Sequence, residues 1–490
     1  MAGADGRVGR TAGWAAGCLT GPMSSTEQTG TPQAHTDPSG SQDAPRYAVA
    51  VIGAGSMGAG IAQVAAQAGH EVHLVDVRDG AAAQAVEKLG ATLRKLAGKG
   101  KISEADAEAA IGRLVVGPAA NGDLTALPAM GLVIEAAVER LDVKQEVFST
   151  LAEHQGADTI VASNTSSLDI AAIAEGVAEP GRVIGLHFFN PPPLMKLVEV
   201  IRGEQSSLQV LDAATELMRS WGKTPVRCTS TPGFIVNRVA RPFYGEAQRM
   251  AQRGSASPAD LDLALTEYGG FAMGPFRLTD LIGQDVNYAV GHSVWQQTDQ
   301  DPRYEPTGFQ DDLVQAGTLG RKTGRGVYTY DDQGKPTDAE GDPFAARALA
   351  RGPVETNVVA RTIAMLVNEA VDLVHRGEAS RRDVDTAMKL GTNYPKGPFE
   401  WLEELGAEKV LADLRVMDAA YPTGRYRPSE ALVAMVDGAD RAAGDRETGG
   451  PAAGDRETGG PAAAGRETRD RETRERETGG HHTDEEKERA

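Results

Sequence analysis

The sequence predicts an α/β domain with a parallel, doubly wound sheet, followed by two copies of an all-α domain. Two observations support this fold class. Strand-like apolar runs alternate with helical patterns up to about residue 231, an order that is typical of a parallel sheet. Beyond that point the strand signals fade, and one helical sequence pattern occurs twice.

The predicted sheet belongs to a domain that spans residues 46–231. Its strands are apolar runs of four to six residues, and helical patterns lie between the earlier ones. The predicted strands are 47–52, 71–76, 131–134, 159–162, 183–186 and 196–201.

The helical region contains an internal repeat. A shift of 123 positions aligns Gly274-Pro-Phe276 with Gly397-Pro-Phe399, and no gap is needed. We interpret residues 232–330 and 353–430 as two copies of one helical unit. Duplication of a scaffold is the simplest interpretation.

Both ends of the chain have the composition of disordered segments. Residues 1–45 are rich in Gly, Ser, Thr, Pro and Gln, and residues 439–490 consist largely of mixed-charge repeats. Neither segment has enough apolar residues to offset the entropy of ordering. Met23 is an alternative translation start. His481 and His482 lie in the C-terminal segment, where a solvated polar tail is a simpler interpretation than a metal site.

The composition argues against several classes of protein. The 490 residues carry 50 Lys and Arg against 69 Asp and Glu, a net charge of −19, which argues against nucleic acid as the main partner. No apolar stretch approaches the roughly 20 residues of a membrane span, and no signal peptide is predicted. The two cysteines, Cys18 and Cys228, exclude a disulfide framework and a Cys-based zinc site, so we expect a reducing, cytoplasmic environment and no metal.

A glycine-rich segment follows the first predicted strand and opens a helix. In Gly53-Ala-Gly55-Ser56-Met57-Gly58, the first glycine permits a tight turn, the second admits a pyrophosphate, and the third lets helix and strand pack closely. Asp76 ends the next strand, near the spacing of about 20 residues expected for a ribose-binding acid. This Rossmann-type arrangement predicts NAD rather than NADP, although Arg78 lies nearby. The alternative is a purely structural glycine turn.

A histidine and a glutamate are predicted to face each other on neighbouring strands. If the chain folds back around Pro193, His187 and Glu199 become cross-strand partners. The carboxylate would then fix the imidazole tautomer and stabilise the imidazolium. Such a dyad can remove a proton from an alcohol while hydride leaves the same carbon. The alternative is a buried histidine held by a structural carboxylate.

Two further polar positions have more than one interpretation. Ser166, in a cluster of hydroxyl residues after a strand, could bind a substrate oxygen or cap the next helix. Asn237, which opens the helical region, could bind a ligand or cap a helix as well. The residues alone leave both choices open.

The chain resembles the 3-hydroxyacyl-CoA dehydrogenase family, in particular bacterial members with a duplicated C-terminal domain. The resemblance covers residues 46–430, and its motifs occur in family order. They are the glycine segment at 53–58, 133–139, 163–168, 187–191, 195–199, 232–238 and 320–328.

The resemblance implies oxidation of an L-3-hydroxyacyl-CoA to the 3-oxoacyl-CoA with NAD. By motif position, His187 is the general base and Glu199 its orienting partner, while Ser166 and Asn237 bind the reacting oxygen and the carbonyl of the substrate. The family pattern also places Glu139 and Lys144 near the nicotinamide ribose. It places Thr92 and Lys99 at the CoA, which is the expected small-molecule partner.

The second copy departs from the pattern of the first. Ala360 stands where the repeat would place an equivalent of Asn237, so we expect no second active site. In single-copy relatives the helical domain makes a dimer interface. We therefore hypothesise that the second copy imitates this contact within one chain, as a pseudo-dimer, with a homodimer as the alternative. Pro192 stands where the family has another small residue.

Two other functions and two acyl groups stay open. A β-hydroxyacid dehydrogenase acting on a free acid would use a lysine from the helical side, and a non-enzymatic NAD-binding relative would lack part of the dyad. Within the family, the substrate is 3-hydroxybutyryl-CoA or 3-hydroxyadipyl-CoA, which implies fatty acid β-oxidation or phenylacetate breakdown. A distal carboxylate would need a cation, and Arg238, Arg241 and Lys196 are the candidates.

Overall fold

The structure is a computed structural model that describes residues 48–117 and 123–447, with side chains up to residue 438. The described residues up to Ala434 belong to one compact unit, and those from Met435 onward to a second. The predicted extension 1–45, Met23, Cys18, His481 and His482 lie outside the described residues.

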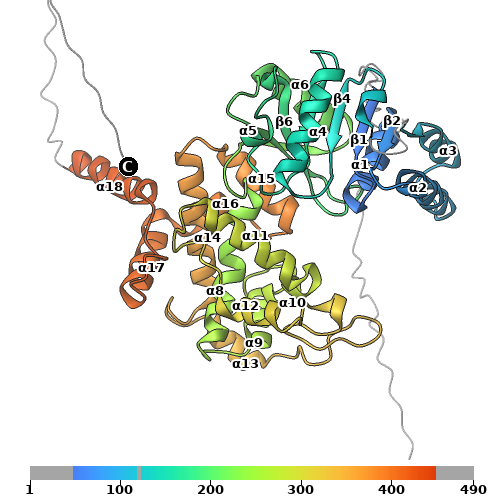
Figure 1. The fold of residues 1–490 in the computed structure, drawn as a ribbon. Helices are drawn as coiled ribbons and strands as arrows, with labels where there is room; N and C mark the ends of the chain where they lie inside the picture. Colours follow the sequence, from blue (N-terminus) through green and yellow to red (C-terminus); the bar gives the residue numbers. More distant parts are fainter. Residues whose placement is uncertain (1–47, 118–122, 448–490) are drawn as a thin grey trace, which may run out of the picture. The chain divides into compact units, whose positions relative to one another are not determined.

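Eight strands form one sheet in the order β3-β2-β1-β4-β5-β6-β7-β8 (Figure 1). Neighbouring strands are parallel, except for the antiparallel pair β6 and β7. The strands are β1 Ala48–Ile52, β2 Glu71–Val75, β3 Leu114–Val116, β4 Leu132–Glu135, β5 Ile160–Ser163, β6 Val183–Phe188, β7 Leu197–Arg202 and β8 Thr224–Thr229. The predicted α/β class is therefore confirmed.

Two strands were not expected from the sequence. Strand β3 has only three residues, too few for a recognisable pattern. Strand β8 has the sequence TPVRCT, in which Pro225 and Arg227 interrupt the apolar run. It forms one edge of the sheet, where proline is tolerated because one side of the strand needs no partner.

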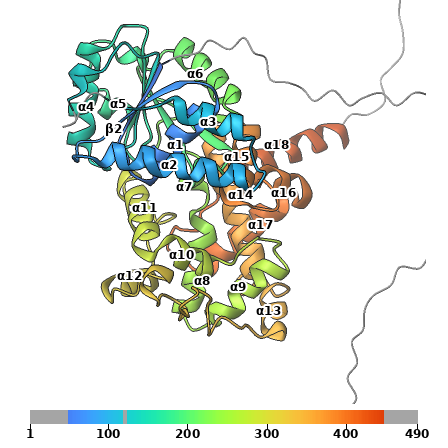
Figure 2. The same cartoon turned by 90° about the vertical axis from the view of Figure 1, so that its right-hand side faces the viewer.

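Helices cover the sheet because their apolar faces pack on it. In α1 the side chains of Ile61 and Ala65 are fully buried. Helices α2 and α3 pack against each other as a hairpin (Figure 2). The helices of this domain are α1 Ser56–Gln67, α2 Ala81–Gly98, α3 Glu104–Gly112, η1 Leu124–Ala126, α4 Leu141–His154, α5 Ile170–Ile173, η2 Pro180–Arg182 and α6 Leu208–Ser220.

The region after the sheet is helical, as predicted, and its elements repeat. Helices α9, α10 and α11 begin at positions that a shift of 123 carries onto the first residues of α15, α16 and α17. The helices are α7 Val236–Val239, α8 Arg241–Gln252, α9 Pro258–Glu267, α10 Pro275–Ile282, α11 Gln284–Gln297, α12 Gly308–Gln315, η3 Arg321–Thr323, α13 Pro343–Leu349, α14 Val358–His375, α15 Arg381–Thr392, α16 Pro398–Leu405, α17 Ala407–Ala420 and α18 Glu430–Glu447.

The two copies meet through reciprocal buried ion pairs. Arg238 of the first copy binds Glu369 of the second, and Arg361 of the second binds Glu246 of the first. These four side chains are at most 3 % exposed. The same shift of 123 relates the two arginines and the two glutamates. An interface in which each contact occurs twice with the roles exchanged has the symmetry of a twofold dimer.

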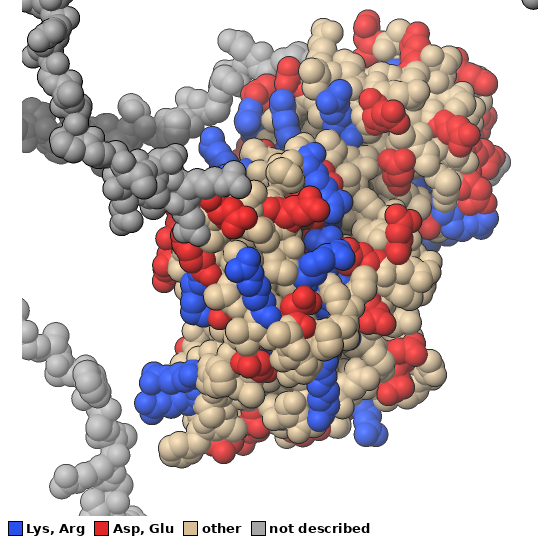
Figure 3. All heavy atoms as spheres, turned by 90° about the vertical axis from the view of Figure 1, so that its left-hand side faces the viewer, with Lys and Arg blue, Asp and Glu red and all other residues tan. Residues whose placement is uncertain are grey.

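The end of α18 corrects one expectation. Residues 439–447, which composition assigns to the disordered tail, continue this helix. Alanine, arginine and glutamate there favour helix even without an apolar face. None of the helices within the described residues is both long and apolar enough to cross a membrane. Lys and Arg side chains are interspersed with Asp and Glu on the face shown in Figure 3.

The reciprocal ion pairs predict a large loss of stability in Glu246→Gln. This change leaves Arg361 and Arg425 buried without their counter-ion, which typically costs about 3–5 kcal/mol. Urea unfolding should show this loss, and Glu369→Gln, the equivalent change in the second copy, should behave similarly. The exposed Glu267→Gln is the matched control. A Glu246→Gln protein as stable as the control would contradict the role assigned to these pairs.

The same carboxylate predicts a pH dependence of stability. Burial alone would raise the pKa of Glu246, but the charges of Arg425 and Arg361 outweigh burial and lower this pKa to about 2. A lowered folded-state pKa stabilises the protein above the unfolded value of about 4.5. This contribution should disappear as pH falls from there toward 2, and the free energy of unfolding of Glu246→Gln should lack this part of the acid sensitivity.

Candidate active site

The predicted cross-strand pair is present. In the antiparallel ladder of β6 and β7, His187 lies opposite Glu199, and His187 Nδ1 is 2.7 Å from Glu199 Oε2. A carboxylate only accepts hydrogen bonds, so Nδ1 carries the proton. Nε2 is therefore the basic nitrogen, and it makes no hydrogen bond with any described residue.

Glu199 also binds the start of the helical region. Its Oε1 accepts hydrogen bonds from the backbone N–H groups of Ile235, at 3.1 Å, and Val236, at 2.9 Å. Phe234, just before them, has a φ of 49°, which non-glycine residues rarely adopt. The carboxylate is fully buried, yet both of its oxygens have hydrogen-bond donors.

A cavity of about 480 Å³ brings six predicted site residues together. The α/β domain contributes one part of its wall, and α7, α10 and α11 with the start of α8 contribute the other. The predicted residues in the wall are Met57, Glu139, Lys144, Ser166, His187 and Asn237.

Three of these residues are joined by direct contacts. Asn237 Nδ2 donates to the backbone oxygen of Ser166 at 3.3 Å. Glu139 Oε1 accepts from the backbone N–H of Ser166 at 2.9 Å and from its hydroxyl at 3.3 Å. The hydroxyl of Ser166 and the amide of Asn237 therefore lie together in the wall that holds the imidazole.

Lys144 is buried and compensated by two acids. Its Nζ lies 2.7 Å from Glu135 Oε1 and 3.3 Å from Glu139 Oε2. Burial of Glu139 raises its pKa, but the charge of Lys144 and the hydrogen bonds from Thr165, Ser166 and Ser167 outweigh burial, so that the net pKa is lowered. Glu139 therefore remains anionic at the edge of the cavity.

The glycine segment fits a dinucleotide. A Cβ on Gly53 would lie 2.5 Å from the oxygen of Ala136, and one on Gly58 would lie 1.8 Å from the oxygen of Gly53. A Cβ on Gly55 would meet no atom within 4 Å. Gly53 and Gly58 thus permit close packing. Gly55 faces open space at the N-terminus of α1, where a diphosphate can bind the free N–H groups.

Asp76 is held beside this segment. Its Oδ2 accepts the backbone N–H of Ala54 at 2.7 Å, and both of its oxygens accept hydrogen bonds from the Arg78 side chain at 2.9 Å. The hydrogen bonds from Arg78 lower the pKa of Asp76 to about 2. A permanently ionised carboxylate at this position suits ribose hydroxyls and repels an additional phosphate.

Some predicted residues lie outside the cavity. Thr92 and Lys99 are exposed at α2 and its C-terminal end, and neither lines the cavity. Two of the three candidate cations are also elsewhere. Arg238 is buried among Glu369, Asp372 and Glu378, and Lys196 is exposed to solvent. Their placement depends on tertiary contacts that the motif does not encode.

Other residues in the wall were not predicted. The side-chain oxygen of Asn164 accepts a hydrogen bond from the backbone N–H of Phe188 at 2.8 Å. Asn164 lies in the motif at 163–168, so the sequence did indicate this region. Phe189 follows the histidine, and its ring centroid is 4.6 Å from that of His187. Tyr244, Ile282, Val286, Asn287 and Val290 come from the helical region. No sequence pattern marks them.

Pro192 has a structural role. A Cβ on Gly60 of α1 would lie 2.7 Å from the Pro192 ring. The turn between His187 and Glu199 therefore packs directly on the helix that the glycine segment opens. The extra proline fills the space that Gly60 leaves.

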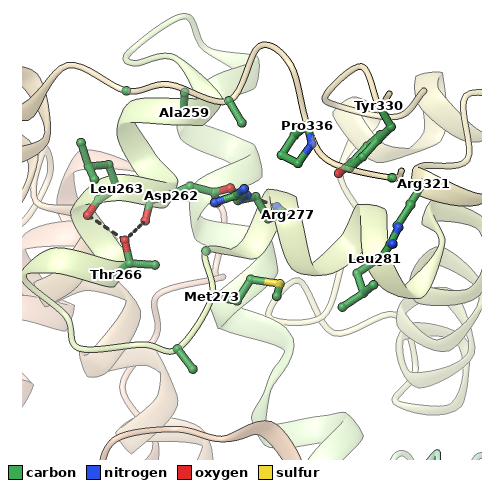
Figure 4. Close-up of a pocket in the computed structure, with 15 residues that line it drawn as sticks. Ala259, Asp262, Leu263, Thr266, Met273, Arg277, Leu281, Arg321, Tyr330 and Pro336 are labelled. Carbon is green, nitrogen blue, oxygen red and sulfur yellow. Dashed lines mark hydrogen bonds between the residues drawn. The ribbon is translucent and has the colours of Figure 1, made fainter. Parts of the chain in front are cut away.

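A second cavity, of about 370 Å³, lies between the first helical copy and the segment that follows it, which contributes Pro336 to the wall (Figure 4). Its wall includes Asp262, whose carboxylate accepts the backbone N–H groups of Phe276 and Arg277 at the start of α10. Asp385 makes the equivalent bond to Phe399 in the second copy. Because both copies contain this contact, we interpret Asp262 as a structural residue.

Comparison with known proteins places this geometry in a family. Residues 48–231 match the NAD binding domain of 3-hydroxyacyl-CoA dehydrogenase, and residues 233–330 and 357–447 match its C-terminal domain. The chain belongs to the 3-hydroxyacyl-CoA dehydrogenase family. The first domain of this family member is therefore its NAD-binding domain, and the C-terminal domain is present twice.

Individual relatives cover different shares of the chain. A 3-hydroxyadipyl-CoA dehydrogenase of Escherichia coli is 41% identical over 460 residues, which is 78% of this chain and 96% of that protein. The human mitochondrial hydroxyacyl-coenzyme A dehydrogenase is 41% identical over 285 residues, 58% of this chain and 90% of that protein. A crystal structure of 3-hydroxybutyryl-CoA dehydrogenase from Escherichia coli aligns with a TM-score of 0.72 and 38% identity, covering 82% of this chain and all of that one.

The open space at Gly55 predicts the effect of Gly55→Val. The backbone at Gly55 has φ −69° and ψ −174°, which valine can adopt, so the fold should be kept. The side chain would occupy the space for the diphosphate, and NAD affinity should fall at least about tenfold, equivalent to about 1.4 kcal/mol. Calorimetric titration with NAD measures this. Gly156→Val, at another glycine with open space, is the control. Unchanged NAD affinity in Gly55→Val would place the dinucleotide elsewhere.

Proposed function

We propose that this protein oxidises an L-3-hydroxyacyl-CoA to the 3-oxoacyl-CoA with NAD. The observation that carries the proposal is the His187–Glu199 hydrogen bond in the wall of a cavity that also contains Met57 of the dinucleotide segment. A general base and a nicotinamide site next to each other are what oxidation of a secondary alcohol requires. The family relationship supports the acyl-CoA as substrate.

His187 is the proposed general base. Its Nε2 accepts the proton of the 3-hydroxyl group, and the resulting imidazolium is stabilised by the hydrogen bond from Nδ1 to the Glu199 carboxyl group. Bound NAD supplies the acceptor for the hydride that leaves C3. As the proton departs, the substrate oxygen becomes a carbonyl oxygen, and donors placed in advance stabilise its partial charge.

Ser166 and Asn237 are the proposed donors to substrate oxygens. Their contact in the wall brings a hydroxyl group and a side-chain amide together beside the imidazole. Glu139 and Lys144 are proposed to lie at the nicotinamide ribose, where the carboxylate can accept from ribose hydroxyls. Each of these four residues has a polar group that suits the role assigned to it.

Thr92 and Lys99 are the proposed CoA contacts. They are exposed and seven residues apart, which is close to two helical turns, so they lie on one side of α2. A hydroxyl and an ammonium group there suit the polar and phosphate groups of CoA. Neither residue lines the active-site cavity, which fits a substrate that extends beyond it.

The two competing functions have less support. A dehydrogenase of free acids would use a lysine from the helical side, but among the described residues the only lysine in the cavity wall is Lys144, from the α/β domain. A non-enzymatic relative has no need of an oriented histidine with a free Nε2.

The cellular setting is proposed on composition and chemistry. Cys228 is free and buried, and burial raises the pKa of its thiol well above the usual value. An inert thiol needs no partner, in keeping with a reducing cytoplasm. We propose fatty acid β-oxidation or phenylacetate breakdown as the pathway, because both include oxidation of a 3-hydroxyacyl-CoA.

The proposed base predicts the effect of His187→Asn. Loss of a general base typically costs about 10²–10⁴-fold in rate, so NADH formation from L-3-hydroxybutyryl-CoA, followed at 340 nm, should fall by this factor. NAD affinity should remain unchanged. His154→Gln, at an exposed histidine on α4, is the control. Retained activity in His187→Asn would exclude it as the base.

We also propose that the second copy replaces a partner subunit. The exchanged roles of Arg238–Glu369 and Arg361–Glu246 support this, because they repeat one contact about a twofold axis. Phe271 and Tyr394, also equivalent positions, meet edge to face with ring centroids 5.0 Å apart.

This pseudo-dimer predicts self-association of a chain that ends at Tyr330. Removal of the second copy exposes the face that holds Glu246 and Arg238, and sedimentation should show a dimer of the shortened chain. The same chain with Glu246→Gln should dimerise more weakly, since each subunit then lacks the carboxylate that pairs with Arg238 of the other subunit. A stable monomeric shortened chain would contradict the proposal.

A further inference from the structure

One cation in the wall of the active-site cavity has no acidic partner. Arg241 lies at the start of α8, and its Nε donates to the backbone oxygen of Asn237 at 2.7 Å. Nη1 donates to the backbone oxygen of Asn287 at 3.4 Å, and the guanidinium lies over the Tyr244 ring, 5.0 Å from its centroid. No carboxylate of the described residues forms an ion pair with it.

The guanidinium has unused donors. It carries five N–H groups, and the two carbonyl oxygens occupy two of them. Nη2 has no acceptor among the described residues. Arg241 is only partly exposed, and burial lowers its pKa. A partly buried charge without a counter-ion is unfavourable, so an anionic ligand would be bound strongly.

The other buried cations nearby are compensated. Lys144, in the same wall, is bound by Glu135 and Glu139. Arg238 precedes Arg241 by three residues and lies outside this wall. It is paired with three acids. Arg241 thus differs from both by facing the cavity with its charge unpaired.

The position of Arg241 restricts the anion to the acyl chain. It follows Asn237 by four residues, a rise of about 6 Å along a helix. Asn237 is proposed to bind a substrate oxygen, so the anion lies within a few bonds of the reacting carbon. The phosphates of CoA are separated from this carbon by the long pantetheine arm, and the NAD diphosphate is assigned to the glycine segment of α1.

We propose that Arg241 binds a carboxylate at the end of the acyl chain, and that the enzyme prefers 3-hydroxyacyl-CoA substrates that end in a carboxylate. This inference rests on the proposed dehydrogenase function and names its substrate class. A six-carbon chain carries its carboxyl carbon three bonds beyond C3, whereas a butyryl chain ends one bond beyond it. Ile282, Val286 and Val290 provide apolar wall for the intervening methylene groups. A planar guanidinium binds a carboxylate through two parallel hydrogen bonds.

The test compares two substrates of equal length, 3-hydroxyadipyl-CoA and 3-hydroxyhexanoyl-CoA. The native enzyme should have the higher kcat/KM with the carboxylate substrate. Arg241→Met should lower that kcat/KM on the order of 100-fold and leave or raise the value for 3-hydroxyhexanoyl-CoA. Arg241→Lys keeps the charge without the planar fork, so its loss should be intermediate. Lys196→Met, at the exposed candidate cation, should leave the ratio of the two values unchanged.

Two results would overturn the inference. Equal losses with both substrates in Arg241→Met would show that Arg241 only supports the Asn237 carbonyl. A native enzyme that prefers 3-hydroxyhexanoyl-CoA would exclude a carboxylate site. If Arg241→Met does not fold, Arg241→Lys carries the same comparison, with a loss restricted to the carboxylate substrate as the supporting result.

Binding without turnover separates this inference from the proposed function. Adipyl-CoA and hexanoyl-CoA lack the reacting hydroxyl, and calorimetry measures their affinities directly. Tighter binding of adipyl-CoA that disappears in Arg241→Met supports the carboxylate site even if no 3-hydroxyacyl-CoA is oxidised, which would refute the dehydrogenase function alone. Equal affinities in the native protein would overturn the carboxylate site whatever the activity.

Discussion

The geometry of the site depends on the carboxylate of Glu199. One of its oxygens receives the Nδ1–H of His187 from the neighbouring strand, and the other receives the N–H groups of Ile235 and Val236. The same group therefore selects the imidazole tautomer and attaches the first helix of the helical region to the sheet. Asn237 is the second residue of that helix, so the hydrogen bonds of Glu199 also fix where Asn237 lies relative to the imidazole.

The second helical copy supports this arrangement from behind. Gly391 of α15 lies so close to β7 and α7 that a Cβ would be 2.8 Å from Leu197 and 3.0 Å from Val236. The same Cβ would touch Phe189, whose ring contacts that of His187 at an interplanar angle of 48°. The N–H of Thr229 on β8 donates to the backbone oxygen of Glu378, which extends hydrogen bonding from the sheet edge into the second copy. A copy with alanine in place of the site asparagine thus still contributes to the packing around the active site.

The sequence was informative where local geometry decides the outcome. Residues 189–196 join β6 to β7 and contain three consecutive prolines. A fold-back centred on Pro193 pairs His187 with Glu199, because the two residues are equally far from it along the chain. The glycine segment encodes its own turn, because Gly53 has a φ of 105° and Gly58 packs against the carbonyl group of Gly53. Arg241 could only be named as one of three candidate cations. The sequence does not show that acids of the second copy pair with Arg238 and leave Arg241 without an acidic partner. The edge strand β8 was missed because Pro225 and Arg227 hide its pairing with β7.

The covalent link between the two copies changes how their contact responds to concentration. A contact between separate subunits weakens on dilution, whereas two parts of one chain meet at an effective concentration set by the segment that joins them. Dilution and subunit exchange therefore cannot separate Arg238 from Glu369. In a dimer of identical subunits, every mutation appears in both subunits. In this chain a mutation can change one copy and leave the other as it was. The second copy has no α/β domain of its own, so alanine can stand at its equivalent of Asn237 without loss of an active site. A substitution in the contact face of one copy also leaves the contact face of the other copy unchanged.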